Sequence, residues 1–76
     1  QPTLKPQNEP TVVRASYNVS TRGKVGKLET RVVAGDRDAS LNSFRRQLSS
    51  ILFRPRWIRG EPEAVSGLRR EYQLLD

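Results

Sequence analysis

One amphipathic stripe is the strongest constraint on how this chain can fold. Between Asp38 and Pro55 the apolar residues recur at the spacing of one face of an α-helix, and polar residues occupy the other face. Either Asp38 or Ser40 is expected to cap the helix start by accepting a backbone N–H bond. Pro55 is expected to end the helix or to follow its end. The apolar stripe comprises Leu41, Phe44, Leu48, Ile51 and Leu52.

Two stretches before this helix have the alternation of half-buried β-strands. Segment 11–19 alternates apolar and polar residues, and segment 25–34 does so from Leu28 onward. Gly23 lies between them and can adopt the positive φ of a tight turn, so the two segments predict a β-hairpin. Val25 is out of phase, and Gly26 beside it indicates a bulge or a late strand start. The residues expected to face the core are Val13, Ala15, Tyr17, Val19, Leu28, Thr30, Val32 and Ala34.

The chain after Pro55 begins with turn-forming residues and ends in a third alternating run. Segment 56–67 contains three Gly or Pro residues and is expected to form a loop or a second tight hairpin. The last run, from Leu68 to Leu75, predicts a strand that starts as early as Ala64 if Gly67 forms a bulge. Leu68, Tyr72 and Leu74 fall on one face of this strand, which Arg70 shares.

These elements predict an α+β fold of β-β-α-β order. A three-stranded antiparallel sheet of order 2-1-3, with the helix packed on one face, would bury the helix stripe and leave the second and third strands as edges. The domain is expected over residues 11–76. Residues 1–10, with Pro2, Pro6 and Pro10, are expected to form an extended linker. Because the chain starts at Gln1 and not at Met, we expect it to be part of a longer protein.

The sequence offers little for catalysis. It contains no His and no Cys, which excludes imidazole bases, thiol nucleophiles and the usual zinc ligands. Its eight carboxylates are scattered along the chain, and the predicted fold brings no pair together. We therefore expect no enzyme activity, no cofactor, no metal site and no small-molecule substrate.

The formal net charge of +6 makes a nucleic-acid ligand an alternative. Tyr17 and Tyr72 are expected to point toward the helix, however, which leaves Trp57 as the one aromatic residue free to stack on a base. Solvated basic surface is the simpler interpretation. The basic residues in question are Arg14, Arg22, Lys24, Lys27 and Arg31 on the hairpin, and Arg54, Arg56 and Arg59 around Trp57.

The last strand is the candidate binding site. An edge strand has unpaired backbone N–H and C=O groups, so it can accept an extended peptide as an additional strand. No Pro interrupts this strand. Such an edge also allows a homodimer in which the last strands pair or swap. The candidate partner-binding residues are Leu68, Arg69, Arg70, Glu71, Tyr72, Gln73 and Leu74.

The ordered features resemble the C-terminal domain of the TonB family of energy transducers, over roughly residues 12–74. The hairpin text TRGKVGKLETRVVAGD contains the Gly-Xaa-Val of that family at Gly23 to Val25. The helix text SLNSFRRQL follows. The family's aromatic-basic-proline exit stands at Phe53 to Pro55, and its Gly-Xaa-Pro turn at Gly60 to Pro62. The alternating text LRREYQL closes the match. The chain differs from the family at its start, where QPTLKPQNEP replaces a short helix.

The resemblance implies a periplasmic domain of the cell envelope, tethered to the inner membrane by segments outside this chain. It implies that the last strand binds an extended segment of an outer-membrane transporter and transmits force to it. TonB-like domains also occur on periplasmic proteins that assemble or scaffold other proteins, so that alternative stays open.

Overall fold

The computed structural model describes residues 9–74. The expected linker therefore lies outside the described residues, apart from Glu9 and Pro10. In chain order, the elements of the described part are β1 (Val12–Val19), β2 (Val25–Ala34), α1 (Asn42–Ser50), β3 (Arg56–Ile58), β4 (Glu61–Glu63) and β5 (Val65–Gln73).

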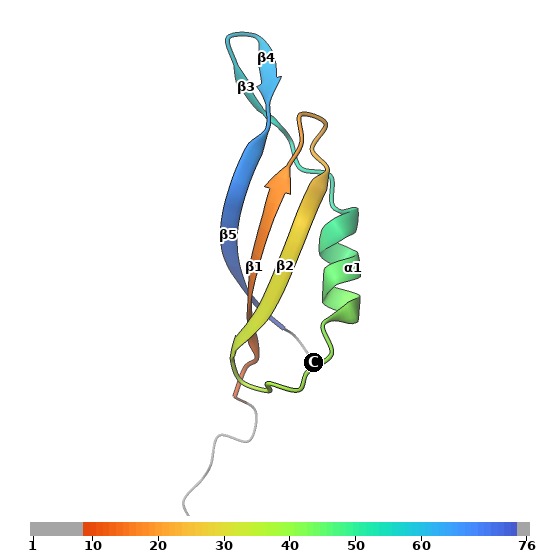
Figure 1. The fold of residues 1–76 in the computed structure, drawn as a ribbon, viewed down its shortest axis with the longest axis vertical. Helices are drawn as coiled ribbons and strands as arrows, with labels where there is room; N and C mark the ends of the chain where they lie inside the picture. Colours follow the sequence, from red (N-terminus) through yellow and green to blue (C-terminus); the bar gives the residue numbers. More distant parts are fainter. Residues whose placement is uncertain (1–8, 75–76) are drawn as a thin grey trace, which may run out of the picture.

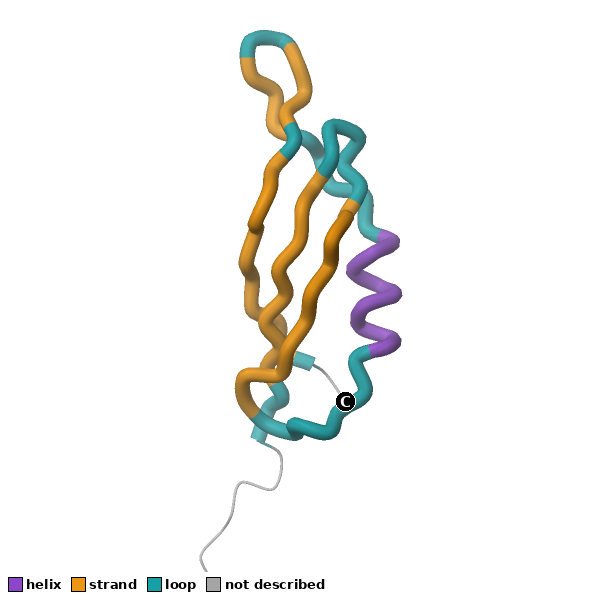
Figure 2. The backbone as a smooth tube through the Cα atoms, in the orientation of Figure 1, coloured by secondary structure: helices purple, strands orange, loops and turns teal. Residues whose placement is uncertain are grey.

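The fold is α+β, with a three-stranded antiparallel sheet and one helix beside it (Figure 1). The strand order is β2-β1-β5, which confirms the predicted order 2-1-3 because β5 is the predicted third strand. The strands β3 and β4 form a separate two-stranded hairpin, which projects beyond one end of the main sheet (Figure 2). The alternative of a second tight hairpin after Pro55 is therefore the one observed.

The core lies on the helix side of β1. Val13, Ala15 and Tyr17 have no exposed surface, and Val19 is buried beside them. All four were predicted to face inward. Leu48 of α1 is buried in the same cluster, and partly buried side chains from β2, α1 and β5 pack around it. The helix stripe and the central strand therefore form one core, as apolar burial requires in so short a chain.

Gly23 is essential to the turn between β1 and β2. Its φ of +82° is the positive value predicted for it. Its carbonyl accepts a hydrogen bond of 2.9 Å from the N–H of Phe53. A Cβ at this position would lie 2.0 Å from the Phe53 carbonyl oxygen, so no other residue fits without moving the chain after the helix.

Two predicted bulges are present. In β2, the pairing skips a residue between Gly26 and Glu29, and Lys27 there has a φ of +49°. In β5, the pairing skips a residue between Val65 and Leu68, and Gly67 there has a φ of +67°. The N–H of Gly67 donates to Asn18 Oδ1 of β1 at 2.9 Å. Each bulge shifts the alternation by one residue, which is why both strands look out of phase at one end.

The predicted helix stripe is wrong beyond Ser50. The helix ends there, and Ile51 has the extended dihedrals φ −72° and ψ 136°. Ile51 and Leu52 are 43% and 69% exposed and lie outside the core. The physical reason is that the chain leaves the helix to pair with the β1–β2 turn: Leu52 forms a backbone bridge with Lys24. The helical spacing of apolar residues continues in the sequence after the helix has ended.

The predicted cap is also wrong. The residue before the helix is Leu41, and no side chain caps it. Asp38 is engaged in a local turn, where its N–H donates to Asp36 Oδ1 at 2.9 Å. The hydroxyl of Ser40 is 3.5 Å from the N–H of Asn42, which is too long for a strong bond. The helix therefore depends on packing and not on a cap.

Leu48→Ala is expected to reduce the free energy of unfolding by about 2 to 5 kcal/mol, because it leaves a cavity in the core. The matched control is Leu52→Ala, which removes the same atoms from a side chain that is 69% exposed and should change stability by less than about 0.5 kcal/mol. Urea denaturation of both variants measures the difference. Equal losses would contradict this description of the core.

Candidate protein-binding edge

The predicted binding residues lie on an edge of the sheet. Residues 68–73 belong to β5, and Leu74 directly follows it. One side of β5 pairs with β1, from Val12 opposite Gln73 to Tyr17 opposite Leu68. Within residues 9–74 no strand pairs with the other side of β5. The structure thus places all seven residues along one open edge.

The hydrogen-bond pattern identifies which backbone groups of β5 are free. The N–H of Leu74 donates to the Thr11 carbonyl at 2.8 Å, so Leu74 faces β1. In an antiparallel pair, successive residues point their N–H and C=O alternately toward and away from the neighbouring strand. The groups of Arg69, Glu71 and Gln73 therefore point away from the sheet, toward an incoming strand.

The other edge of the sheet is occupied by arginine side chains. The helix runs along β2 (Figure 1), and its Arg45 donates to the Leu28 carbonyl at 3.2 Å and to Thr30 Oγ1 at 2.8 Å. Arg37 of the preceding loop lies 3.4 Å from the Val32 carbonyl. These guanidinium groups satisfy outward carbonyls that an incoming strand would need. The two edges are thus unequal: β2 is shielded and β5 is open.

The face of the sheet opposite the helix is polar. Arg14 of β1 binds Glu71 of β5 through two nitrogens, at 2.8 and 3.2 Å. Both side chains are about half exposed, so the ion pair contributes little to stability. Its effect is to fix the Glu71 carboxylate over β1 and away from the open edge.

The helix face beside β5 is hollowed at two places. Near the end of the strand, Phe44 and Gln47 of α1 face Tyr72 and Leu74 across a groove of about 650 Å³. Near its start, a groove of about 330 Å³ includes Leu68 and several residues that follow the helix. The helix lies over β2, so it does not cover β5 and leaves these grooves open.

Tyr72 joins the edge strand to the core. Its ring meets Phe44 edge-on at 5.3 Å between centroids, and its hydroxyl lies 2.8 Å from that of the buried Tyr17. Burial, followed by this hydrogen bond, raises the pKa of Tyr72 from 10.0 to about 12, so the hydroxyl stays protonated at neutral pH. Both tyrosines point toward the helix side, as predicted.

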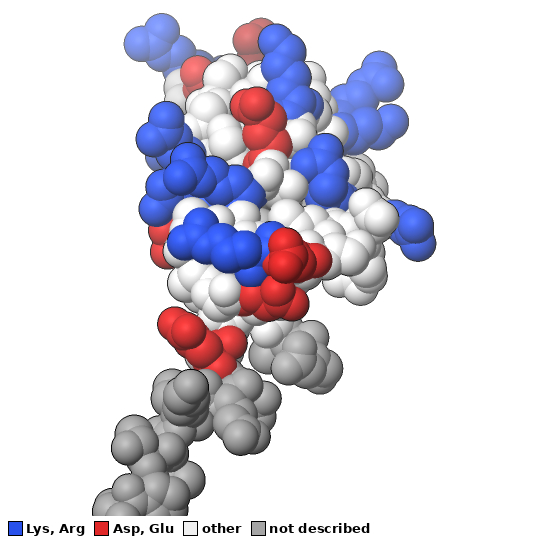
Figure 3. All heavy atoms as spheres, turned by 60° about the horizontal axis from the view of Figure 1, so that its bottom comes forward, with Lys and Arg blue, Asp and Glu red and all other residues white. Residues whose placement is uncertain are grey.

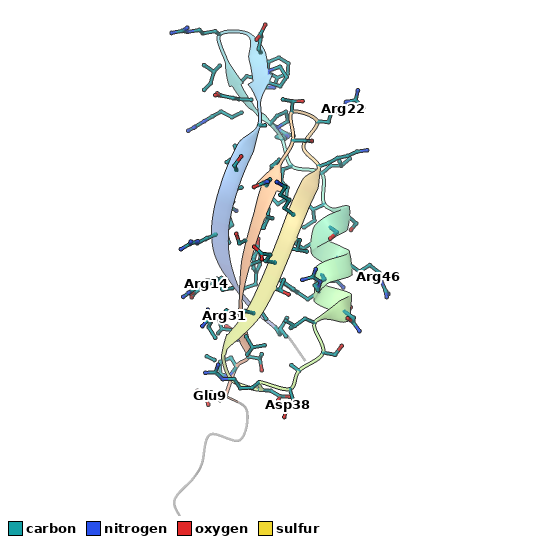
Figure 4. The ribbon with its side chains drawn as sticks, viewed as in Figure 1. Glu9, Arg14, Arg22, Arg31, Asp38 and Arg46 are labelled. Atoms are coloured by element: carbon teal, nitrogen blue, oxygen red, sulfur yellow. The ribbon has the colours of Figure 1, made fainter. Side chains whose placement is uncertain are left out.

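Three basic residues gather on the sheet: Arg14, Arg31 and Arg69 line a shallow groove of about 280 Å³ together with Glu29. Lys and Arg side chains are spread over the visible face with Asp and Glu among them (Figure 3). Trp57 is 64% exposed, but it lies on the projecting β3–β4 hairpin and not on the main sheet. Arg22 lies at the far end of the molecule from Arg14 and Arg31, which are cross-strand partners on β1 and β2 (Figure 4). The stacking surface that a single-stranded nucleic acid needs is therefore reduced to one aromatic ring in the described part.

Residues 9–74 offer neither a metal site nor a membrane-spanning helix. No three His, Cys, Asp or Glu side chains lie close enough together to hold a metal ion. The described helix is too short and polar to cross a membrane.

Comparisons with known proteins assign neither a family nor a function to this chain. No family model, no curated protein and no solved structure matches this chain significantly.

The sequence does not predict that arginine side chains cover the outer edge of β2. The sequence predicts both edges as open and the last strand as the binding site, but it does not indicate that Arg45, one of the polar residues on the outer face of the helix, covers β2. The sequence contains one partial signal, since Arg45 directly follows Phe44 of the predicted apolar stripe. Its contact with Leu28, 17 positions away, depends on how the helix is placed.

Hydrogen exchange tests the assignment of free backbone groups. The amides of Arg69, Glu71 and Gln73 are expected to exchange fast, and those of Arg70 and Tyr72 to be protected by their bonds to β1. NMR-detected exchange on the chain alone measures this. Uniform protection along the strand, or the opposite alternation, would show that the edge is not free.

Arg45→Ala is expected to remove the shield from β2. It loses two charged hydrogen bonds, which should cost about 1 to 3 kcal/mol, and it exposes the Leu28 carbonyl to pairing with another chain. Arg46→Ala is the control, since Arg46 points away from the sheet (Figure 4). Urea denaturation and sedimentation velocity measure stability and association. If both variants remain equally stable and equally monomeric, Arg45 does not shield the edge.

Proposed function

We propose that this chain is a protein-binding domain that takes up an extended segment of a partner as a fourth strand beside β5. The observation that carries the proposal is the inequality of the two sheet edges. Arginine side chains occupy the outward carbonyls of β2, whereas Arg69, Glu71 and Gln73 of β5 keep theirs free. Charged residues and the bulge at Gly67 help to keep this edge soluble, but no strand or side chain within residues 9–74 occupies its outward backbone groups, which favours a binding role.

The resemblance to the TonB family gives this proposal a more specific form. In that form, the domain works in the periplasm, the partner is a segment of an outer-membrane transporter, and the added strand carries a pulling force. The physics of strand addition suits this task, because several ladder hydrogen bonds share a load applied along the strand. The scaffold alternative uses the same edge and differs only in the partner.

A nucleic-acid ligand is the competing class, supported by the net charge of +6. The salt dependence of binding distinguishes a nucleic-acid ligand from a protein partner. Binding driven by phosphate contacts weakens steeply as salt rises, whereas binding through a backbone ladder changes much less.

A titration with a peptide that copies a transporter's coupling segment tests the proposal. Saturating peptide is expected to shift the amide signals of residues 68–74 and to slow exchange at Arg69, Glu71 and Gln73, because their N–H groups become bonded. NMR spectra at low and high salt measure both effects. Unmoved signals along β5, or binding that salt abolishes, would reject strand addition.

A pair of variants isolates the backbone contribution. Arg69→Pro removes the outward N–H, and Arg69→Ala removes the same charge but keeps the N–H. Peptide binding should weaken by about tenfold more in the proline variant, which corresponds to one hydrogen bond of ~1.4 kcal/mol. Protected amides at Arg70 and Tyr72 confirm that both variants are folded.

A further inference from the structure

We propose that the segment bound at β5 is acidic as well as apolar, with an Asp or Glu side chain opposite Arg70 and apolar side chains on either side of it. This inference rests on the proposed function and specifies the chemistry of the partner. It follows from which β5 side chains the added strand would meet, and from their charges.

The register of an added strand fixes these neighbours. Because Arg69, Glu71 and Gln73 would form the hydrogen-bonded pairs, the guest residues between them lie opposite Leu68, Arg70 and Tyr72. Opposite residues in a sheet share a face, so these guest side chains fall on the helix side. Every second residue of the partner therefore meets this helix-side row.

Each end of the row borders a groove that contains apolar side chains among polar ones. A guest side chain opposite Tyr72 lies at the groove lined by Phe44 and Leu74. One opposite Leu68 lies at the groove lined by Val19, Phe53 and Pro55. Apolar side chains at both guest positions would remove the apolar part of this surface from water, which favours binding.

The centre of the row is positive. Arg70 is exposed and forms no ion pair within the described residues, where Arg14 with Glu71 is the ion pair observed. Arg54 and Arg56 line the same groove as Arg70, against a single carboxylate from Glu63. A carboxylate opposite Arg70 completes this site, whereas a Lys or Arg there is repelled.

Charge also disfavours some of the registers in which a second copy of this chain could be the occupant. Two β5 strands related by a twofold axis must pair their outward residues with one another. A register centred on Arg69 or Glu71 then places that residue directly opposite its own copy, whereas a register centred on Arg70 also pairs Arg69 with Glu71. Like charges directly opposite each other destabilise a strand pair. A different protein with the acidic pattern avoids this conflict.

Two short synthetic peptides test the inference. Both alternate apolar residues with threonine, and their central helix-side residue is Glu in one and Lys in the other. The Glu peptide is expected to bind about fivefold more tightly, because it gains an attractive cross-strand pair where the Lys peptide has a repulsive one. Arg70→Glu should reverse that order. Arg46→Glu, the same charge change on the outer face of α1, should preserve it (Figure 4).

The outcomes separate this inference from the proposed function. If both peptides shift the amides of residues 68–74 with equal affinity, strand addition stands and the acidic preference is rejected. If neither peptide shifts them, the proposed function itself fails. If Arg46→Glu lowers the preference as much as Arg70→Glu, the attraction is only to net charge and the site at Arg70 is rejected. Concentration-dependent shifts along β5 without peptide would identify a second copy as the occupant and overturn the inference.

Discussion

The buried ring of Tyr17 on the central strand is the contact on which the rest of this fold depends. It stacks on Phe53 at 5.8 Å between centroids, and its hydroxyl lies 2.8 Å from that of Tyr72 on β5. One side chain thus joins the central strand, an edge strand and the chain leaving the helix. Phe53 in turn reaches back to the Gly23 carbonyl at the hairpin turn. In a chain without disulfides, this network substitutes for a covalent constraint.

This core also sets where the helix can lie, and so which edge remains open. The helix buries Leu48 against β1 and directs Arg45 to the outward groups of β2. The helix lies along β2, and no strand within residues 9–74 pairs with the outer side of β5, so β5 keeps free backbone groups and two open grooves beside it. The function that we propose follows from this unequal coverage: the same placement that completes the core on one side leaves a binding edge on the other.

The sequence predicts the strands better than it predicts the helix, for a physical reason. Strand alternation reports burial directly, so Val13, Ala15 and Tyr17 were identified correctly, and Gly67 marked its bulge. The helical spacing of apolar residues continues to Leu52, so the predicted helix is too long. This spacing cannot show that the backbone leaves the helix to pair with Lys24. The seven site residues were predicted as an edge, which the fold reproduces. The shielding of β2 depends on the contact between Arg45 and Leu28. These two residues are far apart in the sequence, so no local sequence pattern predicts their contact.

The central claim is that a partner binds β5 through alternate backbone groups. Methylation of single amides in the bound peptide tests it most directly, because an N-methyl group removes one donor and leaves the side chains unchanged. Methylation at positions opposite Arg69, Glu71 and Gln73 is expected to weaken binding about tenfold or more, and methylation at the positions between them to change it little. Equal losses at all positions, or no loss at any, would contradict strand addition at this edge.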